Sequence, residues 1–343
     1  MKIVHVSNFT TKRNGDNFYG VEYKLNNGLT RLGHNVFSVC DRDIAANYLF
    51  GIREAGKRSA NRKLRLVCET LRPEFLLLGH ASLIEPETVK AVRHACPGIR
   101  IAHWSCDSLS FDPRNMRLLK LLSSLVDTTF VTTAGETRAE VASGGGRVAY
   151  MPNPVDSSIE TGRAFDAADL ENDLIFVGKP DAERLAICKR IRSQIPRLKF
   201  DIRGMMGFPA VHGAELISLL GCSRMGLALS RPNDALLYSS DRMAQLMGNG
   251  VLTFVDARAG FDRLFKGDEL VCYEDGDALI AKLRHFMTHD DERRATAHRG
   301  WQRAHASFSG TLVAKWIVES TFGLPPSQNY AWPMEVYGGS LSR

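Results

Sequence analysis

Apolar and polar positions along the first half of the chain alternate between two kinds of stretch. Short apolar runs are typical of buried parallel strands, and between them apolar residues recur every three or four positions, as in amphipathic helices. Strands are predicted at 3–7, 35–41, 75–79, 101–105, 128–133 and 148–151, with helices near 18–32, 58–72, 85–95, 114–126 and 135–143. Regular strand–helix alternation predicts a doubly wound parallel sheet.

The pattern breaks at residues 152–173, which are polar and turn-rich, and we interpret them as a linker. A second series follows, with strands predicted at 174–177, 200–203, 226–230, 251–255 and 270–273 and helices near 182–193, 213–221, 240–247, 277–288, 290–305 and 312–322. The predicted fold is therefore α/β, with two Rossmann-like domains in tandem and a ligand cleft between them. The expected domains are 1–154 and 155–308, with 309–343 joining the first; the tail 323–343 either straps across that domain or is loose.

Composition narrows the class of protein. The chain has 343 residues, 44% hydrophobic and 24% charged, and no apolar run approaches a membrane span. The N-terminus enters a strand directly and the seven cysteines are scattered without metal spacing, so we expect no signal peptide and a cytoplasmic location. The modest net charge of +6 suits an anionic small ligand or an anionic membrane surface better than nucleic acid.

Parallel sheets bind ligands beyond the carboxyl ends of their strands, so the loops there are examined first. Loop 8–20 lacks the GxGxxG pattern of dinucleotide sites, and its Asp16 either lies near a reacting hydroxyl or belongs to a surface turn. Asp41 and Asp43 form a DxD that could hold a divalent cation, although turn and helix-cap acids fit the pattern better.

The stretch HWSCDSLSFD at 103–112 joins a predicted strand end to a helix start. Asp112 precedes a proline and reads as an N-cap, which leaves Asp107 as the better candidate for a general base. The following helix, 114–126, is basic and amphipathic, so it either packs on the sheet or lies on anionic lipid.

Cations recur at the strand ends of the second half: Lys179, Arg203, Arg231 and Arg242. Cations that gather at one sheet edge suit an anionic ligand, whereas scattered solvated cations are the alternative. A serine, Ser239 or Ser240, is expected to cap the helix that contains Arg242, whose first turn would then seat a phosphate.

Several stretches resemble GT-B glycosyltransferases. GHNV at 33–36 is similar to a motif of nucleotide-sugar transferases, and PNPVD at 152–156 resembles their domain junction. Residues 225–310, including SDRMAQLMGNGVLTFVD, resemble the C-terminal domain of CgeB-like and group 1 glycosyl transferases. HWSCDS is similar to a Trp-x-x-Asp stretch in the N-terminal domain of CgeB-like proteins.

The resemblance implies a nucleotide-sugar donor held by the second domain. Relatives commonly have Glu where this chain has Gln245, and Leu237 occupies the place of the first member of a paired-Glu pattern, so retention and inversion both stay open. No metal and no cofactor are implied beyond the nucleotide-sugar substrate. The implied donor-binding residues are Lys179, Arg203, Tyr238, Ser239, Ser240, Arg242 and Gln245.

The function expected is glycosyl transfer to a hydroxyl of a glycan or lipid-linked acceptor, in bacterial cell-surface polysaccharide or lipopolysaccharide synthesis. Asp107 or Asp16 would serve as the base. Peripheral contact with the inner face of the membrane is a further expectation, and no nucleic-acid partner is expected. A nucleotide-sugar epimerase of the same architecture and a non-catalytic nucleotide-sugar-binding protein are the alternatives.

Overall fold

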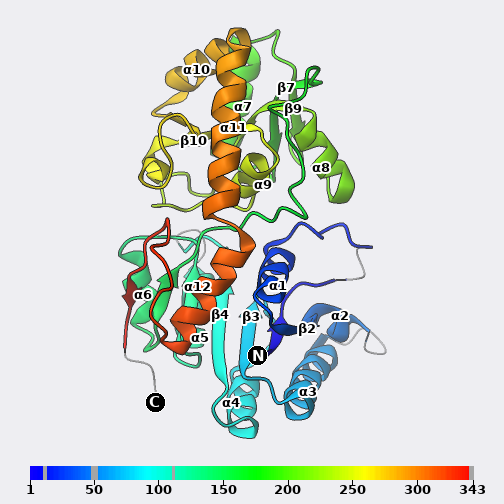
Figure 1. The fold of residues 1–343 in the computed structure, drawn as a ribbon. Helices are drawn as coiled ribbons and strands as arrows, with labels where there is room; N and C mark the ends of the chain where they lie inside the picture. Colours follow the sequence, from blue (N-terminus) through cyan, green and yellow to red (C-terminus); the bar gives the residue numbers. More distant parts are fainter. Residues whose placement is uncertain (11–13, 48–52, 110–112, 340–343) are drawn as a thin grey trace. The chain divides into compact units, whose positions relative to one another are not determined.

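The computed structural model describes residues 1–10, 14–47, 53–109 and 113–339. The chain divides into two compact units, one of Met1–Pro152 with Gly310–Arg343 and one of Asn153–Ser309. Each unit is built on its own mainly parallel sheet with helices around it (Figure 1). This confirms the predicted α/β fold class with two parallel-sheet units in tandem.

The sheet of the first unit has the strand order β12-β6-β5-β4-β3-β1-β2. All neighbours are parallel except β12, which runs antiparallel to β6 and pairs Val336 with Ala149. The tail of the chain therefore straps onto this sheet. The strands are β1 (Lys2–Val6), β2 (Asn35–Val39), β3 (Phe75–Gly79), β4 (Arg100–Ser105), β5 (Thr128–Val131), β6 (Val148–Tyr150) and β12 (Val336–Tyr337).

The helices of this unit cover the sheet, and α12 returns from the far end of the chain to pack beside α1 (Figure 1). The two helices approach closely because Gly28 has no side chain; a Cβ there would lie 2.2 Å from the carbonyl oxygen of Gly310. The helices are α1 (Val21–Arg31), α2 (Asp41–Ala46), α3 (Arg53–Leu71), α4 (Pro86–Ala95), α5 (Pro113–Ser123), α6 (Thr137–Ala142) and α12 (Gly310–Phe322).

Helix α5 packs its apolar face on the sheet, as one of the two sequence interpretations proposed. Met116 and Leu119 are buried in a cluster with Val131 of β5 and Val141 of α6. Helix α2 was not among the predicted helices, and its acids Asp41 and Asp43 were interpreted as turn or helix-cap residues. It forms because its acids have buried partners: Asp41 accepts a hydrogen bond from the Leu83 amide, and Asp43 accepts one from the Thr10 hydroxyl. These contacts give the DxD acids a structural role.

The second unit has a fully parallel sheet of order β11-β10-β9-β7-β8. Its strands are β7 (Asn172–Val177), β8 (Phe200–Arg203), β9 (Ser223–Leu227), β10 (Leu252–Asp256) and β11 (Val271–Tyr273). Its helices are α7 (Ala182–Gln194), α8 (Gly213–Gly221), α9 (Arg242–Gly248), α10 (Gly276–Thr288) and α11 (Asp290–Ser307), with 3-10 turns η2 (Ala257–Ala259) and η3 (Phe261–Arg263). Strand β9 ends before Ser230, which therefore lies in the loop beyond the strand.

The prediction of a linker at residues 152–173 is wrong for most of that stretch, which packs into the second unit. Asn249, at the end of α9, holds it from both sides: its side-chain oxygen accepts from the Gly162 amide at 3.0 Å, and its carbonyl accepts from Ala164 at 3.0 Å. Phe165 is 3% exposed and stacks on His298. Polar composition misled the prediction because these polar groups find partners within the fold.

Within the described part of the chain, no helix combines the length and the apolar composition needed to cross a membrane.

Candidate functional site

Arg242 stands at the first position of α9, and its side chain ties together the carboxyl ends of two strands. Nε donates to the carbonyl of Val177, at the end of β7, and Nη1 donates to the carbonyl of Leu229 at 2.7 Å. Nη1 also lies 3.1 Å from Oγ of Ser240. The guanidinium therefore has a structural role at the strand-end edge, whatever else it binds.

Arg242 is enclosed but remains charged. Its guanidinium lies over the ring of Phe176 at 4.8 Å from the centroid. Burial, followed by the nearby Arg184 charge, lowers the pKa of Arg242 to about 9, so the side chain stays protonated at neutral pH. The remaining nitrogen, Nη2, lies beside Gly178, where an added Cβ would approach it to 2.6 Å.

Sequence reasoning missed a second buried arginine behind this edge. Arg184 in α7 is 3% exposed and donates to Leu229 O at 2.6 Å and to Lys179 O at 3.0 Å. It pairs with the Asp181 carboxylate at 3.2 Å. Burial lowers the pKa of Arg184, while Asp181 opposes that effect. The i,i+3 spacing of Asp181 and Arg184 at a helix start was the available signal.

The four predicted cations differ in how far their charge is already used. Arg203 makes a bidentate pair with Asp201 of its own strand, at 2.8 and 3.0 Å, which raises its pKa and compensates its charge. Arg231 lies 4.0 Å from the Asp181 carboxylate. Lys179 is exposed, and no ion pair joins its ammonium to another described residue. Lys179 and Arg242 therefore leave the most charge available to a ligand at this edge.

Two glycines let main chain approach main chain at the same edge. A Cβ on Gly204, which has φ +81°, would lie 2.9 Å from the Gly178 carbonyl oxygen. Positive φ and this close approach both require glycine there. The strand ends of β7 and β8 are consequently bare of side chains at these two positions, as a bulky ligand would need.

The other predicted donor-binding residues of the β9–α9 connection are close to Arg242 in the chain. Tyr238 and Ser239 are 7% and 8% exposed, and the carbonyl of Ser239 accepts from the Asn153 side chain at 2.8 Å. The prediction that Ser239 or Ser240 caps α9 is wrong, because Asp241 occupies the N-cap position and no side chain caps the helix. The Ser240 hydroxyl instead accepts a hydrogen bond from Nη1 of Arg242.

Gln245 lies one turn into α9, where it is 9% exposed. Its amide donates to the Asp241 carboxylate at 2.7 Å, so Asp241 supplies an acid close to the position where relatives commonly have Glu. Leu237 has φ 53° and donates from its amide to Ala259 O at 2.7 Å. A non-glycine residue held in the left-handed region stores strain, which marks this connection as tightly specified. Donor contact by these residues stays a prediction.

In the first unit, a cavity of about 160 Å³ opens at the carboxyl ends of β3 and β4. One wall is polar, formed by residues that follow these strands, and the other consists of leucines of α5. The lining residues are Arg42, His80, Ala81, Ser82, His103, Trp104, Ser105, Asp107, Leu118, Leu119 and Leu122. The predicted base Asp107 is thus brought to a cavity with two histidines, whereas Asp16 is not among its lining residues.

Burial disfavours the protonated form of both histidines of this cavity. Burial lowers the pKa of His103 to about 3, and its Nδ1 has no hydrogen-bond partner. Burial also lowers the pKa of His80, although the charge of Asp107 opposes that effect. Asp107 is exposed at the rim, with its amide 3.3 Å from Oγ of Ser105. A carboxylate at the rim is able to accept a proton from a hydroxyl, whereas burial weakens both imidazoles as bases.

A buried chain of polar contacts positions the floor of this cavity. Trp104 donates from Nε1 to Nε2 of His5 at 3.1 Å, and Nδ1 of His5 lies 2.6 Å from the Asn26 side-chain oxygen. Because an indole N–H only donates, Nε2 of His5 must be the acceptor and Nδ1 carries the proton. Burial lowers the pKa of His5 to about 4, which maintains that neutral tautomer.

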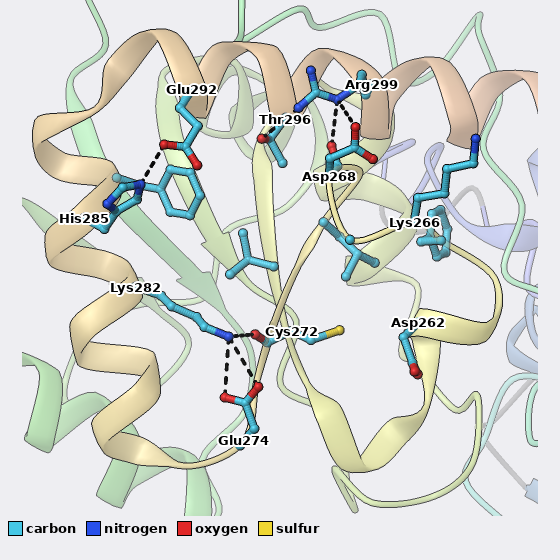
Figure 2. A pocket seen from close by; sticks show the side chains of 15 residues that line it. Asp262, Lys266, Asp268, Cys272, Glu274, Lys282, His285, Glu292, Thr296 and Arg299 are labelled. Carbon is cyan, nitrogen blue, oxygen red and sulfur yellow. Dashed lines mark hydrogen bonds and ion pairs between the residues drawn. The ribbon is translucent and has the colours of Figure 1, made fainter.

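A larger hollow of about 500 Å³ lies along the free edge of β11, between α10 and α11, and contains none of the predicted residues (Figure 2). Its charged groups largely neutralise one another: Lys282 faces Glu274, His285 contacts Glu292, and Arg299 pairs with Asp268 (Figure 2). Its chemistry therefore differs from that of an anion site. Across residues 1–10, 14–47, 53–109 and 113–339, no three His, Cys, Asp or Glu side chains gather in a way that could hold a metal ion.

Comparison with known proteins places this geometry in a class. Among solved structures, sucrose-phosphate synthase from Thermosynechococcus elongatus is similar, with a TM-score of 0.68 at 12% identity, over 93% of this chain and 98% of that one. The Anabaena protein HepE in complex with UDP and glucose has a TM-score of 0.57 at 12% identity, over 94% and 100%. A UDP-forming trehalose-phosphate synthase from Burkholderia xenovorans gives 0.58 at 11%, over 94% and 99%. No match is found among curated protein sequences.

At such low identity these likenesses show the fold, which is that of the GT-B class with its two Rossmann-like units. The family model described as glycosyl transferase-like matches residues 179–316, which include the strand ends of the second unit from Lys179 onward. The family match over this part of the chain and the GT-B fold both agree with the resemblance to GT-B glycosyltransferases seen in the sequence.

Proposed function

We propose that the protein transfers a sugar from a nucleotide-sugar donor bound by the second unit to a hydroxyl acceptor bound by the first. The setting proposed is bacterial cell-surface polysaccharide or lipopolysaccharide synthesis, with no metal and no cofactor beyond the donor. The observation that carries the proposal is the strand-end edge of the second unit, where two buried arginines stand behind bare glycine backbone.

Buried guanidiniums suit the departing nucleotide. Arg184 and Arg242 converge on the carbonyl of Leu229, and their positive charge lies in an enclosed setting where water screens it poorly. A fixed cationic edge stabilises the negative charge that develops on a leaving diphosphate without reorganising. Lys179, exposed at the same edge, supplies a further positive charge. HepE is bound to UDP in its structure, so uridine diphosphate sugars are the first donors to test.

The acceptor is assigned to the cavity of the first unit. Its polar wall offers Asp107 and His80 to a hydroxyl, and its leucine wall offers apolar contact to the rest of the molecule. The acceptor oxygen attacks the anomeric carbon, the bond to the nucleotide breaks, and Asp107 takes the hydroxyl proton, directly or through His80. Asp16, half-buried in the loop before α1, is the second candidate base.

One experiment separates this activity from its alternatives. Calorimetry with UDP-, GDP-, CMP- and dTDP-sugars identifies a donor, and slow hydrolysis of that donor in the same solution distinguishes an enzyme from a binding protein. An epimerase would instead produce a new sugar nucleotide with no acceptor added. Binding of none of these donors would contradict the proposal.

The role of Asp107 is tested on the same material. Asp107→Asn should lower turnover by on the order of 100- to 10,000-fold, the range of a general base, and leave donor affinity unchanged. Asp169→Asn is the matched control, because Asp169 is exposed in the second unit and has no described ion pair. Equal turnover of the Asp107 and Asp169 variants would remove Asp107 from the chemistry.

A further inference from the structure

The outer face of α3 combines exposed cations with an exposed leucine. Leu66 is 47% exposed at the centre of this face. Arg62 and Lys63 lie one helical turn before it, and Arg58 and Arg65 complete the same side. All four cations are exposed, and no ion pair joins any of them to a described residue. The helix thus presents a basic and partly apolar face that nothing in the described chain covers.

A second exposed apolar side chain extends this face onto the sheet. Phe37 lies on the edge strand β2 and is 47% exposed. A shallow hollow of about 220 Å³ separates it from α3 and is lined on the helix side by Lys63, Leu66 and Thr70, among others. Phe37 and Leu66 are therefore two neighbouring exposed apolar side chains. We call these two residues and the four cations the α3 face.

The charge of the α3 face is strongly one-sided. Glu69 is the single acid among the described residues 58–70, against four cations. The buried side of the same helix is apolar, with Leu64 and Cys68 fully covered in the core over β1 and β3. Because its inner side already has partners, the exposed leucine is not explained by packing within the unit.

We propose that the α3 face docks the protein on an anionic lipid bilayer. Basic side chains around an apolar centre match a membrane surface, where phosphate headgroups meet the cations and the acyl boundary receives Leu66 and Phe37. A second copy of this chain would bring two positive faces together and be repelled. Nucleic acid would pair with the cations but leave both apolar projections unused. The inference is independent of the proposed transfer reaction.

The first test measures binding of the full chain to vesicles of equimolar phosphatidylglycerol and phosphatidylcholine by co-sedimentation. Binding is expected to these vesicles but not to pure phosphatidylcholine, and to weaken as salt rises. A cation near an anionic membrane contributes about 1 kcal/mol, which is about fivefold in affinity. Arg62→Gln combined with Arg65→Gln should therefore weaken binding by about 25-fold. The control pair Lys189→Gln and Arg197→Gln, exposed in the second unit, should leave binding unchanged.

The second test asks whether the apolar centre enters the bilayer. Leu66→Trp should show a blue-shifted emission component on anionic vesicles, relative to the unaltered protein, and Leu66→Gln should weaken binding while preserving its salt dependence. The exposed residues Arg117 and Leu121 of α5 provide the competing surface. Loss of binding in Arg117→Gln with Leu121→Ala, but not in the α3 variants, would overturn the assignment. Vesicle binding equal in both α3 and control variants, binding of duplex DNA in its place, or a dimer broken by Leu66→Gln would do so as well.

Discussion

Removing the Arg242 side chain tests whether one guanidinium both supports the strand ends and holds the donor. In Arg242→Ala, the carbonyl of Leu229 keeps its bond from Arg184, whereas the carbonyl of Val177 loses its bond from Arg242. The contact over Phe176 is also lost. A hydrogen bond from a charged group is worth about 1.5–3 kcal/mol and a cation–π contact about 1 kcal/mol. We expect the free energy of unfolding of the second unit to fall by about 3 kcal/mol.

Besides the free energy of unfolding, Arg242→Ala should change the affinity for the donor. If Nη2, beside Gly178, also meets a phosphate, the affinity of the folded variant for the donor nucleotide should fall by a further 1.5–3 kcal/mol, or about 10- to 150-fold. Urea unfolding gives the first number, and calorimetry well below the unfolding transition gives the second. Arg242→Lys should be intermediate in stability because one ammonium lacks the planar fork that reaches both carbonyls.

The two roles are refuted separately. Unfolding of Arg242→Ala at the same urea concentration as the unaltered protein would refute the structural reasoning, since the described contacts would then contribute nothing. Unchanged nucleotide affinity in the folded variant would refute the phosphate contact and leave Arg242 a support for the strands. Arg197→Ala, at an exposed position with no described partner, controls for the loss of one positive charge.

Three further predictions concern the first unit. Burial raises the pKa of Asp41, so its ionisation opposes folding and stability is lost as pH rises through the carboxyl range. Asp41→Asn should therefore raise the free energy of unfolding at neutral pH and lose that advantage in acid. Urea titrations at both pH values will measure the difference. Because burial lowers the pKa of His103 to about 3, only the unfolded chain takes up its proton just below pH 6.5. His103→Gln should therefore reduce the fall of the free energy of unfolding with acidification by about 1.4 kcal/mol per pH unit. An unchanged slope of the free energy of unfolding against pH would contradict the burial of His103 as a neutral group. Gly79→Ala would place a Cβ 1.8 Å from the Trp104 ring and should cost at least about 1–3 kcal/mol, whereas Gly221→Ala, with open space around it, should not destabilise; equal midpoints of thermal unfolding for both variants would disprove the packing argument.

The sequence was informative about the fold because buried parallel strands are apolar on both faces. The run 75–79 needed no tertiary information to be recognised, and β3 has these bounds. Segments whose polar groups are satisfied at long range were misread. Residues 152–173 appeared as a linker, yet Asn249 holds their backbone. Helix α2 was not predicted, yet its acids bind partners elsewhere in the chain.

The chain by itself determined that two parallel sheets form and that cations follow the strands of the second one, because both features follow from local periodicity and order. Only the tertiary structure decided how each cation is used. Arg203 is compensated by Asp201, Arg242 is engaged by strand-end carbonyls, and Arg184 reaches the same edge from helix α7. The physical reason is that a side chain's charge is available to a ligand only after the fold's own acceptors have been satisfied, and those acceptors come from distant positions in the chain.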